Sequence, residues 1–145
     1  DSDIRTLQDL ADKVVAVQST TKPEELFLNA EQNGLPRLRR LYSLQNRDLL
    51  YTTLLKGYAD ALAAHESAIR QFMKDYSVEY RILDEPLMTA RLGVAFSKNR
   101  SDDLPQQLTE VFQEMLADGT VRQIVSRYLD DPEHYLDGLE DSTHA

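Results

Sequence analysis

The sequence of 145 residues lacks cysteine and tryptophan, and it has only three histidines. Without cysteine there can be no disulfide scaffold, no thiolate zinc site and no cysteine nucleophile. Every apolar run stays far below the ~20 residues that a transmembrane helix requires. Basic residues are also in deficit, 16 against 25 acidic ones. The resulting net charge of −9 argues against non-specific nucleic-acid binding and against docking on anionic lipid.

What the sequence does contain is typical of a soluble globular domain, with 41% hydrophobic and 28% charged residues. At this length we expect one compact domain that buries roughly 68% of the surface of the unfolded chain. The first four residues, DSDI, do not have the pattern of a signal peptide. We therefore expect a cytosolic protein, a processed mature protein, or a piece of a longer chain.

Apolar segments that suit strands alternate with segments of helical periodicity. The predicted strands are 13–18, 38–44, 58–63, 78–83 and 91–96, and the predicted helices are 21–32, 46–56, 66–76, 104–116 and 121–129. This alternation indicates an α/β fold with a mainly parallel sheet flanked by helices, followed by two C-terminal amphipathic helices. After residue 130 the chain becomes polar and acidic, and we expect its last ten residues to fray.

Two local features of the predicted helices can be checked directly. Thr21 and Glu24 fit a capping box, in which each side chain binds the backbone N–H of the other residue. In the helix 46–56, one face is predicted to consist of Leu49, Leu50, Thr53 and Leu54.

The loop between the first predicted strand and its helix is the most informative candidate site. Ser19, Thr20 and Thr21 bring hydroxyls and free backbone N–H groups to the positive end of a helix dipole. Such a loop can bind a carboxylate or a phosphate, and in open parallel sheets ligands lie at the carboxyl ends of the strands. The alternative is that these residues only cap the helix.

A second candidate pair, His65 and Glu66, follows the predicted strand 58–63. In one interpretation, the two side chains point into the same crevice. In the other, they are a surface histidine and a glutamate that the helix dipole favours. Asp130, Asp131 and His134 have no standard metal-ligand spacing. The common phosphate-binding and catalytic motifs are missing, so we predict no metal, no cofactor and no enzymatic activity.

Four motifs occur in an order that is typical of one family. Residues 9–21 (DLADKVVAVQSTT) are similar to D-L-x-G-K-x-V-x-V-x-x-G-[ST]-T, and 46–61 end in L-x-x-G-x-x-D-A. Residues 92–98 (LGVAFSK) are similar to G-[IV]-A-x-x-K, and 104–128 contain D-G-T at 118–120. In this order the motifs resemble the bacterial family 3 extracellular solute-binding proteins, the periplasmic binding proteins of the polar-amino-acid type.

The resemblance implies a type II periplasmic-binding-protein fold, in which two α/β lobes clamp a ligand. Residues 4–88 would form the second lobe, 89–130 the hinge-return strand and closing helices of the first lobe, and 131–145 a polar tail. The bulk of the first lobe is missing from this sequence. The apolar stripes of the two C-terminal helices must then pack on the second lobe or on another chain, for instance in a swapped homodimer.

The resemblance also implies roles for the candidate residues. Thr20 and Thr21 match the family's hydroxyl and N–H donors to a ligand carboxylate. His65 stands where the family has an aspartate for the ligand's ammonium group, and Glu66 is one position further on. Ser19 replaces a glycine of the family motif, which would hinder close approach of the backbone.

We therefore predict non-catalytic binding of a small polar or anionic solute, an amino acid or related carboxylate. The protein would be periplasmic, and its partners would be the missing first lobe or a membrane permease of the ABC type. The alternative is a periplasmic sensing domain of a membrane-anchored signalling protein. An enzyme on the same fold is a third reading, for which no positioned acid–base pair is evident.

Overall fold

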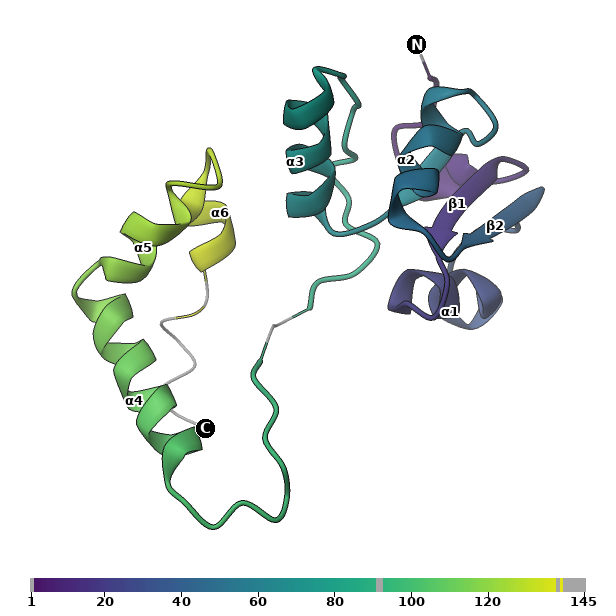
Figure 1. Cartoon of the computed structure of the whole chain (residues 1–145). Coiled ribbons are helices and arrows are strands. Elements are labelled where there is room, and N and C mark those ends of the chain that lie inside the picture. Colours follow the sequence, from purple (N-terminus) through teal and green to yellow (C-terminus); the bar gives the residue numbers. More distant parts are fainter. Residues whose placement is uncertain (1, 91–92, 138, 140–145) are drawn as a thin grey trace. The chain divides into compact units, whose positions relative to one another are not determined.

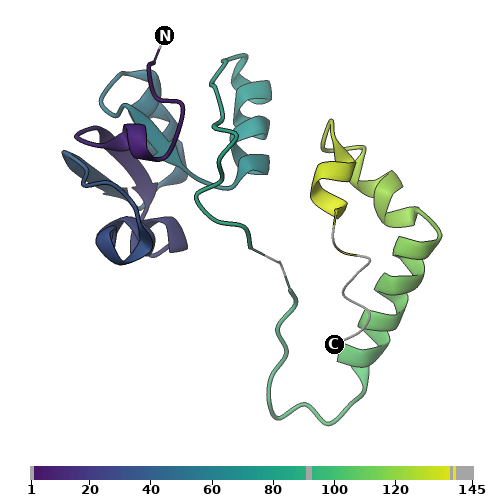
Figure 2. The ribbon, with the colours of Figure 1, turned by 180° about the vertical axis from the view of Figure 1, so that it is seen from behind.

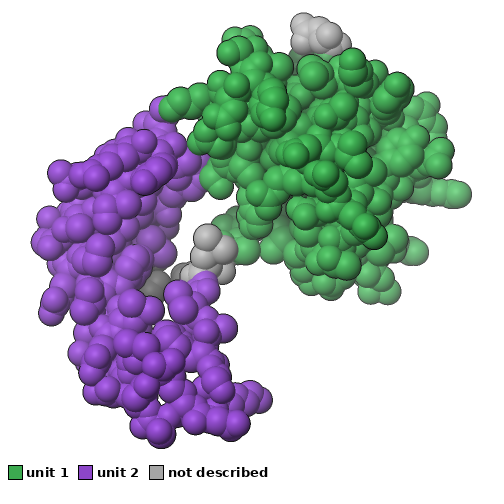
Figure 3. All heavy atoms as spheres, in the orientation of Figure 1, with its two compact units in different colours: residues 1–90 green, residues 91–145 purple. Residues whose placement is uncertain are grey.

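A computed structural model describes residues 2–90, 93–137 and 139 of the chain. It divides into two compact units, residues 1–90 and residues 91–145 (Figure 3). Each unit is described by itself below, because their relative positions are not determined. Among the described residues, no helix has the length and apolar character needed to cross a membrane.

The first unit is built around a three-stranded parallel sheet (Figure 1). Its strands are β1 (Val14–Gln18), β2 (Arg40–Leu44) and β3 (Ala61–Ala63), in the order β2-β1-β3. Val17 of the central strand pairs with Ser43 on one side and with Ala63 on the other. The predicted α/β fold with a parallel sheet is thus confirmed.

A helix follows each strand of this sheet (Figure 1, and seen from behind in Figure 2). The helices are α1 (Lys22–Leu28), α2 (Arg47–Leu55) and α3 (Glu66–Tyr76), and short 3₁₀ turns lie at Gln8–Leu10 and Glu31–Asn33. Parallel strands need such crossovers, because the chain must return to the end of the sheet at which the strands begin before each new strand.

The core of the first unit lies on both faces of β1. Val15 and Val17 pack in a cluster with Phe27 of α1, whereas Val14 and Ala16 pack in a second cluster with Leu50 of α2. The continuous apolar run of this strand is explained by its double cover, since a strand buried on both faces needs no polar alternation.

Stacked aromatic rings join α2 and α3. The Phe72 ring lies 4.1 Å from the ring of Tyr51 and 4.4 Å from that of Tyr76, measured between centroids. The predicted apolar face of α2 is therefore partly wrong: Tyr51 is buried, whereas Leu49 is 53% exposed. Because Phe72 of α3 stacks on Tyr51, the buried face of α2 includes Tyr51. The periodicity of α2 alone does not predict this contact.

The predicted strand 78–83 does not form. Its side chains do alternate between half-buried and exposed positions, but the segment pairs with no strand among the described residues. Side chains hold it instead: the Arg81 guanidinium donates to the carbonyls of Ile4 and Ser2. The alternating pattern reflects one-sided packing of an extended chain, which does not require a sheet partner.

The predicted strand 91–96 is also not found where the structure can be examined. Residues 93–96 are not in a strand, and residues 91 and 92 lie outside the described residues.

The second unit contains helices α4 (Leu104–Ala117), α5 (Thr120–Val125) and α6 (Pro132–Leu136). The two predicted helices are confirmed, although α5 ends earlier than expected and α6 was not predicted. Val121 is the one buried hydrophobic residue in the described part of this unit. The apolar stripes are exposed, at Leu104, Leu108, Val111, Phe112, Ile124 and Tyr128. The frayed end predicted for the last ten residues falls mostly outside the described residues.

Candidate functional site

The loop at Ser19, Thr20 and Thr21 follows β1 directly and leads into α1. The Ser19 N–H donates to the Leu44 carbonyl at 2.9 Å, which prolongs the pairing of β1 with β2. Thr20 is exposed and has a φ of +61°. A β-branched residue in this left-handed region is unusual and costs roughly 1–2 kcal/mol. Ser19 does not have a positive φ, so a side chain in place of glycine creates no backbone strain there.

Both threonine hydroxyls donate to backbone carbonyls of the loop itself. Thr20 Oγ1 lies 2.6 Å from the carbonyl of Ser19, and Thr21 Oγ1 lies 2.5 Å from that of Gln18. A hydroxyl has one proton to donate but two lone pairs that accept. In this conformation the two side chains can accept a hydrogen bond from a ligand, and each must rotate before it can donate one.

The predicted capping box is wrong by one residue. Thr21 is the N-cap of α1, but its side chain makes no capping bond. The Glu24 carboxylate instead accepts from the N–H of Thr20, with Oε2 at 2.6 Å from the nitrogen. The Thr21 hydroxyl is oriented by its donation to the Gln18 carbonyl, and the N–H of Thr20, in its left-handed turn, is the donor that Glu24 uses.

Two hydrogen bonds stabilise the charged form of Glu24. Hydrogen bonding from the Ser43 side chain on β2 has the larger effect on the pKa, and the bond from the Thr20 N–H has the smaller one. Together they lower the pKa of the Glu24 carboxyl below its ordinary value, against a smaller opposing effect of burial. Glu24 thus links the loop to the edge strand β2.

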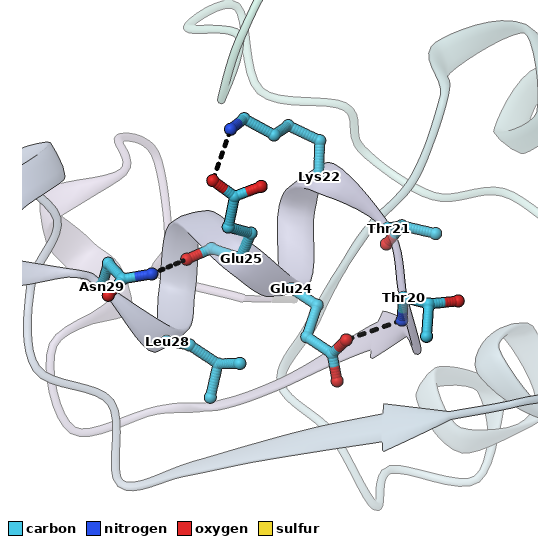
Figure 4. A pocket seen from close by; sticks show the side chains of 7 residues that line it. All are labelled: Thr20, Thr21, Lys22, Glu24, Glu25, Leu28 and Asn29. Carbon is cyan, nitrogen blue, oxygen red and sulfur yellow. Dashed lines mark hydrogen bonds and ion pairs between the residues drawn. The ribbon is translucent and has the colours of Figure 1, made fainter.

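A pocket lies beside α1 and includes part of the loop (Figure 4). Its lining residues are Thr20, Thr21, Lys22, Glu24, Glu25, Leu28 and Asn29. Within it, Lys22 Nζ pairs with Glu25 Oε1 at 2.6 Å, and the Asn29 side chain donates to the Glu25 carbonyl at 2.9 Å. His65 does not line this pocket.

The second candidate pair lies at the start of α3. His65 is the N-cap of this helix, but its exposed side chain makes no capping bond. Its carbonyl accepts from the N–H groups of Ala68 and Ile69. Glu66 is half-buried and pairs with Arg70 one turn later, at 2.7 Å. This carboxylate therefore already has a cationic partner.

The two candidate sites follow neighbouring parallel strands. Because Val17 of β1 pairs with Ala63 of β3, the residues that follow both strands leave the sheet at the same edge. Thr20 and His65 therefore lie beyond one edge of the sheet, which is where ligands bind in open parallel sheets.

Sequence reasoning missed a third group at this edge. Asn46 follows β2 and caps α2, where its side chain accepts from the N–H of Asp48 at 2.8 Å. An asparagine just before a helical pattern is the signal that could have identified it. Ser43 was missed as well, because only the fold brings it to Glu24.

Within the described residues, no three histidine, aspartate or glutamate side chains gather as metal ligands. Asp131 caps α6 by accepting from the N–H of His134 at 3.4 Å. Asp131 therefore has a structural role as a helix cap.

The first unit is thus an α/β lobe with hydroxyl and imidazole groups at the carboxyl edge of its parallel sheet. No family model matches the chain. It is 33% identical over 138 residues to the histidine-binding periplasmic proteins of Escherichia coli K12 and Salmonella typhimurium LT2. These alignments cover 89% of this chain and 51% of each relative, so the chain spans about half the length of the curated relatives it matches.

A solved structure, the substrate binding protein of an amino acid ABC transporter, is similar with a TM-score of 0.67 and 25% identity. That match covers 90% of this chain and 56% of the other. The chain is homologous to these binding proteins, which confirms the resemblance to the family 3 extracellular solute-binding proteins.

Proposed function

We propose that this chain forms one wall of a non-catalytic binding site for a small polar or anionic solute, an amino acid or related carboxylate. It would act in the periplasm as part of a solute-binding protein for ABC-type uptake. The observation that carries the proposal is the pairing of β1 with β3, because it brings Thr20 and His65 to one edge of the sheet. The names of the relatives, which are binding proteins, support a non-catalytic role.

The backbone of the loop also supports a binding role. Thr20 is held at a φ of +61° although threonine disfavours this region. Strained conformations persist only where the surrounding structure enforces them, and they concentrate at ligand-binding and active sites. The strain alone does not identify a ligand, but it agrees with the position of the loop at the sheet edge.

Each candidate residue has a distinct role in the proposal. Thr20 and Thr21 present hydroxyls that can accept a hydrogen bond from a ligand, and Ser19 holds the loop to β2 through its backbone. The His65 imidazole is a better partner for a carboxylate than for an ammonium group. Glu66 contributes less, because Arg70 already pairs with its carboxylate.

The second unit fits the proposal as the part that returns to the first lobe. Residues 4–88 would then be the second lobe, residues 89–130 the return segment and residues 131–145 the tail. The exposed stripe of α4 includes Leu108 and Phe112 and needs a cover, from a first lobe or from a second copy of the chain. A ligand held between two lobes would favour the closed state by its higher affinity for it.

The proposal can be tested by nuclear magnetic resonance on the isotopically labelled chain, titrated with amino acids and small carboxylates at millimolar concentration. We expect saturable shifts of the backbone amides of residues 19–21, 65 and 66. Thr20→Ala should weaken the response, whereas Thr109→Ala should not, since the Thr109 hydroxyl makes a comparable bond to the Pro105 carbonyl on α4. Saturable shifts confined to other residues, or none with any solute, would disprove the site.

A further inference from the structure

Asn33 is followed by Gly34 at the surface of the first unit. The sequence contains four asparagines, and this is the one that precedes a glycine. Asn33 is exposed and ends the 3₁₀ turn Glu31–Asn33, after which Gly34 has a φ of +66°. A Cβ at Gly34 would meet no atom within 4 Å, so the space beside its backbone is open.

The side chain of Asn33 caps the end of α1. Its amide nitrogen donates to the carbonyl of Leu26 at 3.2 Å and to that of Asn29 at 2.8 Å. Leu26 lies in the last turn of α1, where the carbonyls have no partner within the helix. Asn29 also contributes, since its own amide donates to the Glu25 carbonyl (Figure 4). Asn33 therefore supplies donors that the end of this helix needs.

We propose that Asn33 is a site of spontaneous deamidation, which opening of its turn permits and which removes the cap of α1. The co-reactant is water. The inference is independent of the proposed function, because it requires no solute.

The reaction joins the side chain of Asn33 to the backbone of Gly34. The Gly34 nitrogen loses its proton to hydroxide and attacks the Asn33 Cγ. The bond from Cγ to Nδ2 breaks, and the amide takes a proton from water and leaves as ammonia. Water then opens the succinimide ring, either at Cγ to give aspartate or at the backbone carbonyl to give isoaspartate. Glycine favours the attack, because no side chain shields its nitrogen.

The folded turn restrains this attack. Before Cγ can meet the Gly34 nitrogen, the Asn33 amide must leave both of its carbonyl partners. The Gly34 N–H is held loosely, at 3.4 Å from the Glu31 carbonyl, whereas the Gly34 carbonyl accepts from the Gln8 side chain at 2.9 Å. A short 3₁₀ turn at the surface opens at low cost, so the bond from Gln8 should control how often the reactive geometry forms.

The product has an acceptor where the structure needs a donor. A carboxylate at position 33 has no proton to donate at neutral pH. It would lie against the carbonyl oxygens of Leu26 and Asn29, which carry partial negative charge at the end of α1. Deamidation should therefore destabilise the C-terminal end of this helix.

The first test follows the reaction itself. The folded chain is incubated in mildly alkaline buffer, and mass spectrometry of its peptides measures the conversion of each asparagine. We expect conversion at Asn33, with the other three asparagines intact. Gly34→Ala should slow it at least about tenfold, because a Cβ shields the nitrogen. Gln8→Ala should accelerate it several-fold, whereas Gln71→Ala, which removes a comparable bond to Asp75 on α3, should not.

The second test concerns the cap. Asn33→Asp reproduces the aspartate product, and Gln32→Glu adds the same charge at the exposed neighbouring position. We expect Asn33→Asp to lower the melting temperature by several degrees and Gln32→Glu to leave it nearly unchanged. Circular dichroism measures both values and verifies the fold of every variant.

Each part of the inference can fail separately. An intact Asn33 after incubation would overturn the modification site, and equal rates for wild type and Gln8→Ala would overturn control by the turn. Equal melting temperatures for Asn33→Asp and Gln32→Glu would overturn the role as a cap. If Gly34→Ala is unfolded, the comparison of Gln8→Ala with Gln71→Ala decides. None of these results depends on solute binding, so the proposed function stands or falls by its own test.

Discussion

The two units of this chain reach regular structure by different means. In the first, β1 is covered on both faces, and Val15, Ala16 and Val17 have no exposed surface. In the second, Val121 is the one buried hydrophobic among the described residues, although α4 is the longest helix there. A helical pattern with correct ends can thus define helices without providing a core for them.

The helix ends of the second unit are well defined by local interactions. Pro105 lies in the first turn of α4, where its missing N–H is not needed. Gly119 takes a φ of +81° between α4 and α5, and the Asp118 side chain accepts from the Thr120 N–H at 2.8 Å. Isolated helices of this length are marginal in water, so their stability depends on what covers the apolar stripe.

The largest expected effect concerns matched leucines on a helix of each unit. Leu50 on α2 is 1% exposed, and Leu108 on α4 is 42% exposed. Leu50→Ala should lower the free energy of unfolding by about 2–5 kcal/mol, because it removes buried methyl groups and leaves a cavity. Leu108→Ala should change it by less than about 1 kcal/mol.

Urea denaturation followed by tyrosine fluorescence measures both values. Equal losses for the two variants would contradict the difference between the units, since they would mean that the stripe of α4 is buried in solution. A loss for Leu108→Ala that grows with protein concentration would indicate that a second copy of the chain covers the stripe of α4.

A smaller effect is expected from two glycines with left-handed backbones. Gly34 has a φ of +66° and Gly119 a φ of +81°, and a Cβ at either would meet no atom within 4 Å. Alanine at each position therefore adds only backbone strain, roughly 1–2 kcal/mol. Gly34→Ala should lower the cooperative unfolding free energy of the first unit by about 1 kcal/mol.

Gly119→Ala should instead reduce helix content in far-UV circular dichroism and leave the main unfolding transition in place. The second unit has too small a core to unfold cooperatively with the first, so its loss is local. A main transition lowered by Gly119→Ala as much as by Gly34→Ala would show that the two units unfold together.

The smallest expected effect is a dependence on pH. Backbone N–H groups of Arg5 and Thr6 lower the pKa of the Asp9 carboxyl below its ordinary value of 3.8. A lowered folded-state pKa means that the stabilising contribution is complete above the ordinary value. It is lost as the pH falls from there through the lower folded-state value.

Asp9→Asn should therefore reduce the melting temperature at neutral pH, and the difference from wild type should shrink as the pH falls below 3.8. Asp118→Asn is the counterpart in the second unit, where the Thr120 hydroxyl and N–H lower the pKa of the carboxyl. It should affect helix content and not the main transition. A pH-independent effect of Asp9→Asn would contradict the electrostatic origin.

Much of the fold could be predicted because its signals are local. The apolar run of β1, the periodicity of α3 and the stop at Gly119 each need only neighbouring residues to be recognised. The segment 78–83 could not be assigned, because alternation does not say whether a partner strand exists. Tyr51 was missed because its burial depends on Phe72, 21 positions later in the sequence.

The placement of the candidate residues at the sheet edge could be predicted from the sequence, but their hydrogen bonds could not. The order of strands and loops suffices to place Thr20 and His65 beyond one edge of the sheet. The direction of the hydroxyls and the partner of Glu24 depend on the φ of Thr20, which no threonine propensity would predict. Rules based on the local sequence therefore do not predict the strained backbone of this loop or the hydrogen bonds that depend on it.

The central position of β1 determines how firmly the loop at residues 19–21 is held. β1 is paired on both sides and covered on both faces, whereas β2 and β3 are each paired on one side only within the described part of the chain. Local opening begins where few contacts must be broken, so the outer strands exchange their amide hydrogens sooner than the inner one. Thr20 is therefore anchored to the slowest-opening segment of the sheet, while His65 follows the shortest strand. Brief fraying of β3 would displace the imidazole and leave the threonine where it is.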